Sequence, residues 1–343
     1  MRILFIAPHS PYFVDTAVYR EKAIVELGHQ LISFEDRDFI LPGRIRKKVD
    51  FLHRWDLKRL NKKLVRLASN EKPDLCIVLG GQWILPDTLS EIKKMGISVV
   101  LWTADVPRHF NNILKTAHIY DFIFCAGTEA VEILKNQGLE KVFWLPFACD
   151  PDYHHPVELT DREMEEYAKD IVFVGSFYPN RARVLESIFD LDIAVWGPYW
   201  SRLDKNSILK KKVVDARVNY KEWVKMYNAS KIVLVAHYND GKTPCNQASP
   251  KLYEALACRS FVLVDDQKDA RALFEDKKHV VFFRDGKDLR EKIGYYLNHP
   301  EERKKIAYGG YEEVLRKHTY RHRIGEIFRM LETGNKEARK DER

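Results

Sequence analysis

Short apolar runs alternate with amphipathic stretches along almost the whole chain. In the first half, the runs typical of buried strands are Arg2–Ala7, Gln30–Phe34, Asp74–Leu79, Ile97–Trp102, Phe122–Cys125 and Val142–Leu145. Helical periodicity lies between most of them, for example over Thr16–Leu27 and Pro86–Lys94. Strands that alternate with helices predict a parallel sheet with helices on both faces.

The same alternation returns in the second half after an interruption. Residues 149–169 contain Pro151, Pro156 and a polar, acidic run without a strand pattern, so they are expected to link two domains. Beyond them the strand-like runs are Ile171–Val174, Ile193–Trp196, Lys231–Ala236, Phe261–Val264 and Val280–Phe283. The chain is therefore expected to be an α/β protein with two Rossmann-like, doubly wound domains, residues 1–148 and 170–318.

The C-terminal part has a different pattern. From His299 onward it is helical, with a break expected at Gly309-Gly310. Residues 319–332 predict a further helix whose apolar positions form one stripe, Ile324, Ile327, Phe328 and Leu331. The charged residues 333–343 are expected to be a frayed, disordered tail.

Length and composition agree with a globular protein of two domains. The chain has 343 residues, of which 45% are hydrophobic, and its apolar runs are too short to span a bilayer or to serve as a signal peptide. Its five cysteines form no CxxC pair. Reduced thiols in a cytoplasmic protein are therefore expected, rather than disulfides or a zinc site.

The net charge of +7 is concentrated in one segment. Residues 44–66 hold ten Lys or Arg against only Asp50 and Asp56, with apolar residues at helical spacing. One interpretation is a basic amphipathic helix that contacts an anionic membrane on its cytoplasmic face, or an acidic acceptor. The other, which we favour, is a helix packed on the core with a solvated basic face. No nucleic-acid-binding motif accompanies the charge, so no nucleic-acid partner is expected.

The segment around Ser249 is a candidate anion site. Ser249 suits a helix N-cap and Pro250 the first helical position, which would leave free N–H groups and a positive dipole end for phosphate. Lys251 would add a charge, and Glu254, one turn further, can accept hydrogen bonds from sugar hydroxyls. A nucleotide-sugar fits this pair. An ordinary capped helix with both side chains solvated fits the same residues.

Loops that follow predicted strands supply further candidates, because open parallel sheets bind ligands beyond the carboxyl ends of their strands. Gly175 permits close backbone approach, Ser176 can donate a hydrogen bond and Arg181 can bind phosphate through two N–H groups. The alternative is a plain strand-to-helix turn capped by Asn180 or Ser176. His237 follows another strand of the same domain.

Two candidates lie in loops of the first domain. Asp105 can orient or deprotonate an acceptor hydroxyl, or it can simply brace the loop before Pro107. His9 follows the first strand, where a neutral imidazole could contact donor or acceptor, although a structural role is favoured. The run from Asp150 to His155 has metal-ligand residue types, but its prolines keep it extended, and no metal site is expected.

Several of these segments resemble GT-B glycosyltransferases. The similar motifs are Leu27-Gly28-His29-Gln30-Leu31, Val218-Asn219-Tyr220 and Tyr253-Glu254-Ala255-Leu256-Ala257. The closer similarity, up to about Leu331, is to the spore-maturation CgeB-like branch, through Val174-Gly175-Ser176…Asn180-Arg181 and His318-Thr319-Tyr320…Arg323. The resemblance implies two domains that face each other across a cleft, with a C-terminal helix that crosses back to the first domain.

The resemblance also implies a function and residue roles. It implies a metal-independent, hexosyltransferase-like enzyme without a cofactor, whose donor is a nucleotide-diphosphate-sugar, with a UDP-sugar favoured. The acceptor is a carbohydrate, a protein or a cell-envelope component. The implied catalytic residues are Asp105, Arg181 and Lys251, and the candidate acceptor or donor contacts are His9, Trp102 and Asp105. The implied donor-binding residues are Gly175, Ser176, Asn180, Arg181, Asn219, Tyr220, His237, Ser249, Lys251, Leu252 and Glu254.

One position departs from the resemblance. Related family-4 retaining transferases carry two glutamates, of which the second corresponds to Glu254, whereas the first position here is Asn246. The ribose-binding role therefore carries over to Glu254, and the stereochemical outcome stays open. A sugar-nucleotide epimerase of the same architecture, or a non-catalytic protein that binds nucleotide-sugars or carbohydrates, remain alternatives.

Overall fold

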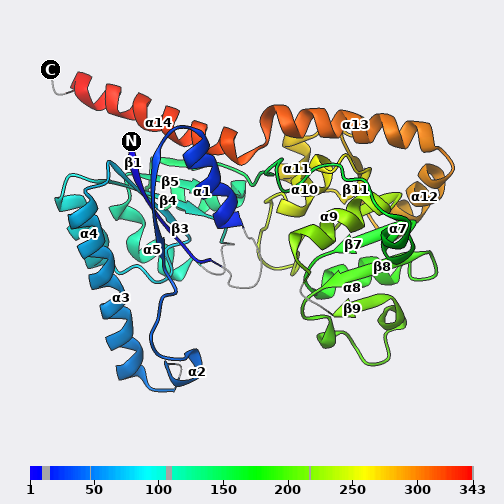
Figure 1. Cartoon of the computed structure of the whole chain (residues 1–343), viewed down its shortest axis with the longest axis horizontal. Helices are drawn as coiled ribbons and strands as arrows, with labels where there is room; N and C mark the ends of the chain where they lie inside the picture. Colours follow the sequence, from blue (N-terminus) through cyan, green and yellow to red (C-terminus); the bar gives the residue numbers. More distant parts are fainter. Residues whose placement is uncertain (10–15, 47, 106–109, 216–217, 342–343) are drawn as a thin grey trace. The chain divides into compact units, whose positions relative to one another are not determined.

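The computed structural model describes residues 1–9, 16–46, 48–105, 110–215 and 218–341. The chain divides into two compact units, Met1–Leu145 and Pro146–Arg343 (Figure 1). Each unit is built around one six-stranded sheet in which every neighbouring pair of strands is parallel. The predicted α/β architecture with two parallel sheets is confirmed.

The first unit has the strand order β2-β1-β3-β4-β5-β6. Its strands are β1 (Arg2–Ala7), β2 (Gln30–Glu35), β3 (Leu75–Leu79), β4 (Ser98–Thr103), β5 (Phe122–Cys125) and β6 (Val142–Trp144). Its helices are α1 (Thr16–Glu26), α2 (Gly43–Arg46), α3 (Asp50–Glu71), α4 (Pro86–Lys94), α5 (Asn111–Thr116), the 3₁₀ turn η2 (Ala117–Ile119) and α6 (Thr128–Lys135).

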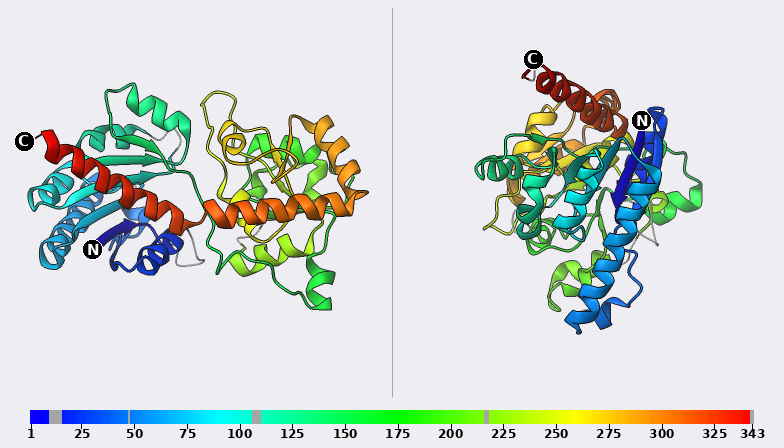
Figure 2. Two further views of the ribbon diagram at one scale, coloured as in Figure 1. Left: turned by 90° about the horizontal axis from the view of Figure 1, so that it is seen from above. Right: turned by 90° about the vertical axis from the view of Figure 1, so that its left-hand side faces the viewer.

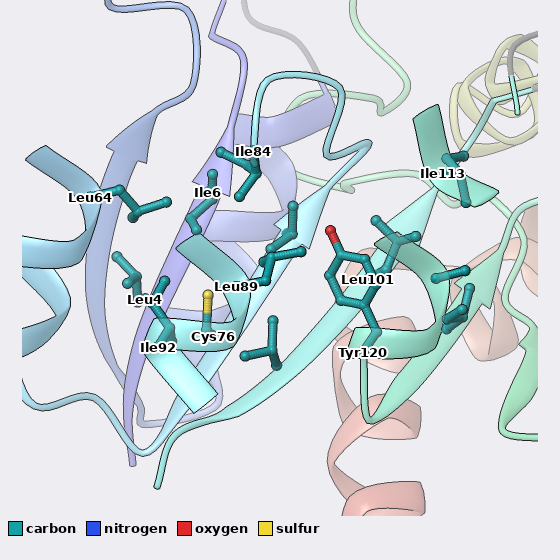
Figure 3. Packing of buried hydrophobic residues seen from close by; sticks show 14 of the residues in the cluster. Leu4, Ile6, Leu64, Cys76, Ile84, Leu89, Ile92, Leu101, Ile113 and Tyr120 are labelled. Carbon is teal, nitrogen blue, oxygen red and sulfur yellow. The ribbon is translucent and has the colours of Figure 1, made fainter. Parts of the chain in front are cut away.

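The core of the first unit follows from the two-residue period of its strands. Leu4 and Ile6 of β1 point to one face and pack with Leu64 of α3 and Leu89 of α4 (Figure 3). The alternate residues of β1 are fully buried as well, because helices cover both faces of the sheet (Figure 2). A sheet buried on both faces explains the continuous apolar runs in the sequence.

The second unit has the strand order β12-β11-β10-β7-β8-β9. Its strands are β7 (Ile171–Val174), β8 (Ile193–Gly197), β9 (Val213–Asp215), β10 (Ile232–Val235), β11 (Val262–Asp265) and β12 (Val281–Phe283). Its helices are α7 (Asp161–Tyr167), α8 (Pro179–Glu186), the 3₁₀ turns η3 (Trp200–Arg202) and η4 (Ile208–Lys212), α9 (Tyr220–Ala229), α10 (Pro250–Ala257), α11 (Lys268–Leu273), α12 (Gly286–Leu297), α13 (Pro300–Lys317) and α14 (Tyr320–Asp341).

Two separate clusters of apolar side chains cover the two faces of this second sheet. Val172 and Val174 of β7 pack with residues of α9 and α10. Ile171 and Phe173 of the same strand belong to another cluster, which includes residues of α8 and α12. Strand β7 is therefore buried on both sides, as a doubly wound fold requires.

Three segments differ from the sequence-based expectation. Residues 149–169 belong to the second unit and contain α7, which begins with a capping box formed by Thr160 and Glu163. Strand β9 carries too short an apolar pattern to have been predicted. Helix α14 continues to Asp341, so the described residues of the expected tail are helical.

The break expected at Gly309-Gly310 is wrong, because α13 runs through both glycines. A Cβ atom at Gly309 would lie 2.4 Å from the carbonyl oxygen of Lys278. At Gly310 it would lie 2.4 Å from the carbonyl oxygen of His279 and 2.6 Å from Cδ2 of Leu256. The two glycines therefore allow α13 to approach its neighbours closely and do not end the helix.

The start of the second unit is bound to the segment before α14. The N–H of Cys149 donates to the carbonyl of His318 at 3.0 Å, and the N–H of Tyr320 donates to the carbonyl of Cys149 at 2.9 Å. Arg323 is buried and donates from Nε to the carbonyl of Pro146 at 3.0 Å. The motif His318-Thr319-Tyr320…Arg323 thus holds two distant parts of the chain together. The crossing of α14 to the first domain remains a prediction, although its four stripe residues are buried.

Candidate functional site

The carboxyl ends of three neighbouring strands form the candidate site of the second unit. Strand β10 lies between β7 and β11, and all three run parallel. Gly175 follows β7, His237 lies two residues after β10, and Asp265 ends β11. Because parallel strands end at the same edge, the predicted residues of β7 and β10 are brought together.

Arg181, in the first turn of α8, is held by backbone carbonyls of this edge. Its Nε donates to the carbonyl of Ala236 at 2.8 Å, and its Nη1 donates to the carbonyl of Ser176 at 3.0 Å. Burial lowers the pKa of Arg181 from its usual value. Within the described residues, Nη2 has no hydrogen-bond partner. The guanidinium is therefore fixed in orientation and keeps donors for an anion.

Glycine at position 175 provides the room for this arrangement. A Cβ atom there would lie 3.0 Å from the ring of Phe173 and 3.4 Å from Nη1 of Arg181. Gly197, at the end of β8, has a φ of +148°, and a Cβ there would lie 2.1 Å from the carbonyl oxygen of Gly175. That oxygen accepts a hydrogen bond from Nε1 of Trp200 at 2.9 Å. A larger residue at either glycine would displace the backbone that positions Arg181.

His237 and Asp265 form a pair that the sequence did not reveal. Nδ1 of His237 lies 2.5 Å from Oδ1 of Asp265, and the backbone N–H of His237 donates to the same carboxylate. In the neutral tautomer that donates from Nδ1 to this carboxylate, Nε2 is an acceptor. His237 was a predicted donor contact. The signal for Asp265 was its position directly after the apolar run of β11.

Two buried polar atoms at this edge lack a hydrogen-bond partner within the described chain. They are Nε2 of His237, a residue 2% exposed, and Oδ1 of Asn180. Nδ2 of Asn180 donates to the carbonyl of His237 at 2.8 Å, so the two residues are in contact. Unsatisfied buried acceptors are costly in a folded protein, and their adjacency indicates a site for hydroxyl or N–H donors of a ligand.

Lys251 and Glu254 bind each other across the first turn of α10. Nζ of Lys251 donates to Oε2 of Glu254 at 2.7 Å and lies 3.5 Å from the ring centroid of Trp223. The side chain of Glu254 is 5% exposed, whereas that of Lys251 is 24% exposed. The sequence suggested separate roles in binding phosphate and ribose. The structure places a cation–π contact and an ion pair on the same lysine, and Trp223 was not predicted.

The start of α10 differs from the expectation of free N–H groups. Ser249 is the N-cap, as predicted, and its Oγ accepts from the N–H of Lys251 at 3.3 Å. The N–H of Leu252 donates to the carbonyl of Ser249 at 3.0 Å. Pro250 has no N–H. These first donors are therefore already used, and the helix start attracts an anion through its dipole and Lys251.

Three other predicted donor-binding residues have structural contacts. Asn219 is the N-cap of α9 and forms a capping box with Glu222. The ring of Tyr220 packs edge-on against Tyr153, with centroids 5.0 Å apart. Leu252 is fully buried in the core of the second unit, so it supports the site without reaching a ligand.

In the first unit, Gln82 and Asp105 meet at the carboxyl ends of β3 and β4. Nε2 of Gln82 lies 3.4 Å from Oδ2 of Asp105, and the N–H of Asp105 donates to Oγ1 of Thr103 at 3.1 Å. Trp102 is buried, donates from Nε1 to the carbonyl of Leu145 at 3.3 Å and stacks on the guanidinium of Arg20. Its burial favours a role in the core over contact with substrate. Pro107, which Asp105 was suggested to brace, lies outside the described residues.

His9 lies between two carboxylates, which favour a charged ring over the neutral imidazole that was expected. Its Nε2 lies 3.0 Å from a carboxylate oxygen of Glu21, and its Nδ1 lies 3.2 Å from one of Glu35. These carboxylates raise the pKa of His9 to about 9, with the hydrogen bond to Glu21 as the largest cause. A cation at this position can attract an anionic group but cannot act as a base at neutral pH.

The segment from Asp150 to His155 is organised by internal contacts. His154 is fully buried, and its Nδ1 accepts from the N–H of Asp150 at 3.3 Å. Burial lowers the pKa of His154 to about 4. Over the described ranges, no three His, Cys, Asp or Glu side chains are grouped as metal ligands. In the same residues, all five cysteines are free thiols, and no helix is both long and apolar enough to cross a bilayer.

Two units, each built around a six-stranded parallel sheet with helices, have the architecture of the GT-B fold. Residues 181–329 match the family described as Glycosyl transferase-like. The chain is 26% identical over 262 residues to Spore protein CgeB of Bacillus subtilis, covering 73% of this chain and 80% of that protein. The resemblance seen in the sequence is confirmed.

Solved structures show the same fold. Sucrose-phosphate synthase from Thermosynechococcus elongatus has a TM-score of 0.69 at 12% identity, over 97% of this chain and 99% of that one. Anabaena HepE in complex with UDP-glucose has a TM-score of 0.67 at 12% identity, over 97% and 100%. A glycosyltransferase from Rickettsia africae has a TM-score of 0.66 at 14% identity, over 96% and 97%.

Proposed function

We propose that the protein transfers a hexose from a uridine-diphosphate sugar to an acceptor, without a metal ion, in the cytoplasm. The comparisons support sugar transfer from a nucleotide-sugar. The choice of uridine is supported by solved neighbours such as Anabaena HepE, which is described in complex with UDP and with UDP-glucose. The acceptor is not identified.

The observation that carries this proposal is the grouping of Arg181, Asn180 and His237 at one sheet edge. Arg181 is the proposed ligand of the diphosphate, because two backbone carbonyls orient it and Nη2 remains available. Oδ1 of Asn180 and Nε2 of His237 are acceptors without partners, so they suit hydroxyl groups of the donor sugar. Cation and acceptors together match a sugar attached to a diphosphate.

Lys251 and Glu254 are proposed to act as a unit at the adjacent helix. Lys251 binds Oε2 of Glu254, and the second carboxylate oxygen is proposed to accept hydrogen bonds from the ribose hydroxyls. Arg181 and Lys251 together would stabilise the negative charge of the departing diphosphate, which is the task that a metal ion performs elsewhere. Asp105 remains the proposed group that orients or deprotonates the acceptor hydroxyl.

Calorimetry with nucleoside diphosphates tests the donor site. UDP is expected to bind more tightly than ADP or GDP. Arg181→Lys is expected to weaken UDP binding about tenfold or more, since a lysine cannot keep both carbonyl contacts and still present a fork to phosphate. Arg183→Lys, an exposed position on the same helix, is the matched control and is expected to leave binding unchanged.

A second measurement tests catalysis. With UDP-glucose and a panel of acceptors, release of UDP in the presence of EDTA is expected. Absence of UDP binding, or equal loss in both arginine variants, would contradict the proposed donor site. Conversion of the donor sugar without release of UDP would indicate an epimerase instead. UDP release that stops in EDTA would contradict metal independence alone.

A further inference from the structure

Helix α3 carries a solvent-facing stripe that the donor site does not use. Phe51, Trp55, Lys58, Lys62 and Arg66 recur at three- and four-residue spacing, so they lie along one face of the helix, and all are exposed. The opposite face is packed: Leu60 and Leu64 are fully buried in the core of the first unit. The packing of α3 on the core is therefore confirmed, whereas the role of its basic face, solvated or in contact with a membrane, stays a prediction. This packing leaves the composition of the exposed face unexplained.

The exposed stripe combines large apolar surface with positive charge. Phe51 is 70% exposed and Trp55 is 48% exposed. Ile45 of α2 and Val49, the N-cap residue of α3, are exposed at the same end of the helix. Single exposed apolar residues are ordinary, but four in one short segment indicate a contact surface.

The cations on this face form a groove of about 530 Å³. Among the described residues, those that line the groove are Trp55, Lys58, Arg59, Lys62, Lys63 and Arg66, and none of these carries a carboxylate. Arg59 and Lys63 are paired with Asp56 and Asp38. In the described part of the chain, Lys58, Lys62 and Arg66 form no ion pair, and they lie on the same stripe as Phe51 and Trp55.

We propose that the exposed face of α2 and α3 binds an anionic lipid surface. A dissolved anion would use the cations but would leave Phe51 and Trp55 in water. A membrane surface accommodates both, because aromatic side chains enter the boundary between headgroups and acyl chains while lysine and arginine contact lipid phosphates. The buried face of α3 stays packed on the core, so binding requires no unfolding of the helix.

This surface lies in the first unit, at a distance along the chain from all the donor-binding residues, and the proposal does not depend on the identity of the donor. It would bring the enzyme to acceptors that are attached to, or embedded in, an anionic membrane. Helix α3 does not meet the requirements of a membrane span, because its exposed face carries several lysine and arginine side chains, and none of the described helices is both long and apolar enough.

Flotation of the full-length protein with lipid vesicles tests the proposal. Vesicles of phosphatidylcholine with added phosphatidylglycerol are expected to bind the protein at low salt, and pure phosphatidylcholine vesicles are expected to bind it far less. Lys58→Gln with Lys62→Gln is expected to weaken binding about 25-fold, at roughly fivefold for each cation near an anionic surface. Phe51→Gln with Trp55→Gln is also expected to reduce binding, although it changes no charge.

Lys210→Gln with Lys211→Gln is the matched control, since both lysines are exposed, lie in η4 of the second unit and carry the same charge. This variant is expected to bind as the unaltered protein does. Equal loss in the control would show that net charge, not α3, drives binding and would overturn the proposal. Failure to bind phosphatidylglycerol vesicles would overturn it as well. The aromatic variant, Phe51→Gln with Trp55→Gln, also separates a membrane from a dissolved anion. If the unaltered protein and this variant bind soluble polyphosphate equally and bind vesicles equally, the ligand is a dissolved anion and the proposal is overturned. UDP binding, measured on the same variants, is expected to be unchanged and separates this test from that of the donor site.

Discussion

Replacement of Lys251 by methionine is expected to destabilise the second unit through Glu254. The carboxylate of Glu254 is 5% exposed and its Oε2 is bound by Nζ of Lys251 at 2.7 Å. Removal of one member of a buried ion pair typically costs about 3–5 kcal/mol, because the remaining charge is left without compensation. Lys251 is 24% exposed, so water reaches its side of the pair, and the lower value of about 3 kcal/mol is expected.

The two members of the pair are expected to respond unequally. Glu254→Gln leaves the ammonium of Lys251 over the Trp223 ring and partly in water. The acceptor of the hydrogen bond then becomes neutral instead of ionised, and the expected loss of stability is about 1.5 kcal/mol. In the double variant Lys251→Met with Glu254→Gln no buried charge is left unpaired. It is therefore expected to be more stable than Lys251→Met alone.

The Tm of each variant is measured by differential scanning calorimetry. For a unit of this size, about 3 kcal/mol corresponds to a decrease in Tm of roughly 6–12 °C. The matched control is Lys278→Met, which breaks a pair of the same three-residue spacing with Glu275 in which both partners are more than half exposed. Exposed pairs contribute about 0–1 kcal/mol, so a small change is expected there. The reasoning is refuted if Lys251→Met lowers Tm no more than Lys278→Met, or less than Glu254→Gln does.

Three further predictions concern other parts of the molecule. The pKa of His9 in the folded protein is about 9, above its ordinary value of 6.5, so its contribution to stability is full below about pH 6.5 and is lost as the pH rises to about 9. In urea unfolding across this range, His9→Gln is expected to abolish this pH-dependent decrease in the free energy of unfolding. His118→Gln, at an exposed position, is expected to retain the decrease. Arg323→Met leaves the buried carbonyl of Pro146 and the partly buried carbonyl of Lys317 without their donor and is expected to cost about 2–4 kcal/mol in the same assay. Arg321→Met, exposed on the same helix, is expected to be neutral; equal effects would contradict the contacts of Arg323. Gly310→Ala is expected to destabilise the second unit by about 1–3 kcal/mol, because the new Cβ would lie 2.4 Å from the carbonyl oxygen of His279. Gly294→Ala, with open space around its Cβ position, is expected to stabilise the unit slightly. Stabilisation by both substitutions would indicate that α13 is not packed as closely as described.

The sequence was sufficient to predict most of the regular elements and the fold class. Buried parallel strands require apolar residues on both faces, so they leave continuous runs that are visible without a structure, as for Phe122–Cys125 and Ile171–Val174. Helix caps are equally local: Ser249 and Pro250 start α10 where expected. The three residues of β9 are too few to form a recognisable pattern. The two glycines of α13 suggested a break in the helix, because the residues that they approach closely in space are distant in the chain and cannot be seen from the local sequence.

The sequence also indicated which strand-end residues to consider, among them Arg181 and His237. Only the tertiary structure decided what these residues contact. Asp265 meets His237, and Glu21 and Glu35 surround His9, because parallel strands bring distant loops to one edge of a sheet. The burial of Glu254 beside Lys251 and Trp223 depends in the same way on how α9 and α10 pack on the second sheet. Residue types at strand ends are a local property of the chain. Charge state, burial and hydrogen-bond partners depend on long-range packing, which a single sequence does not directly reveal.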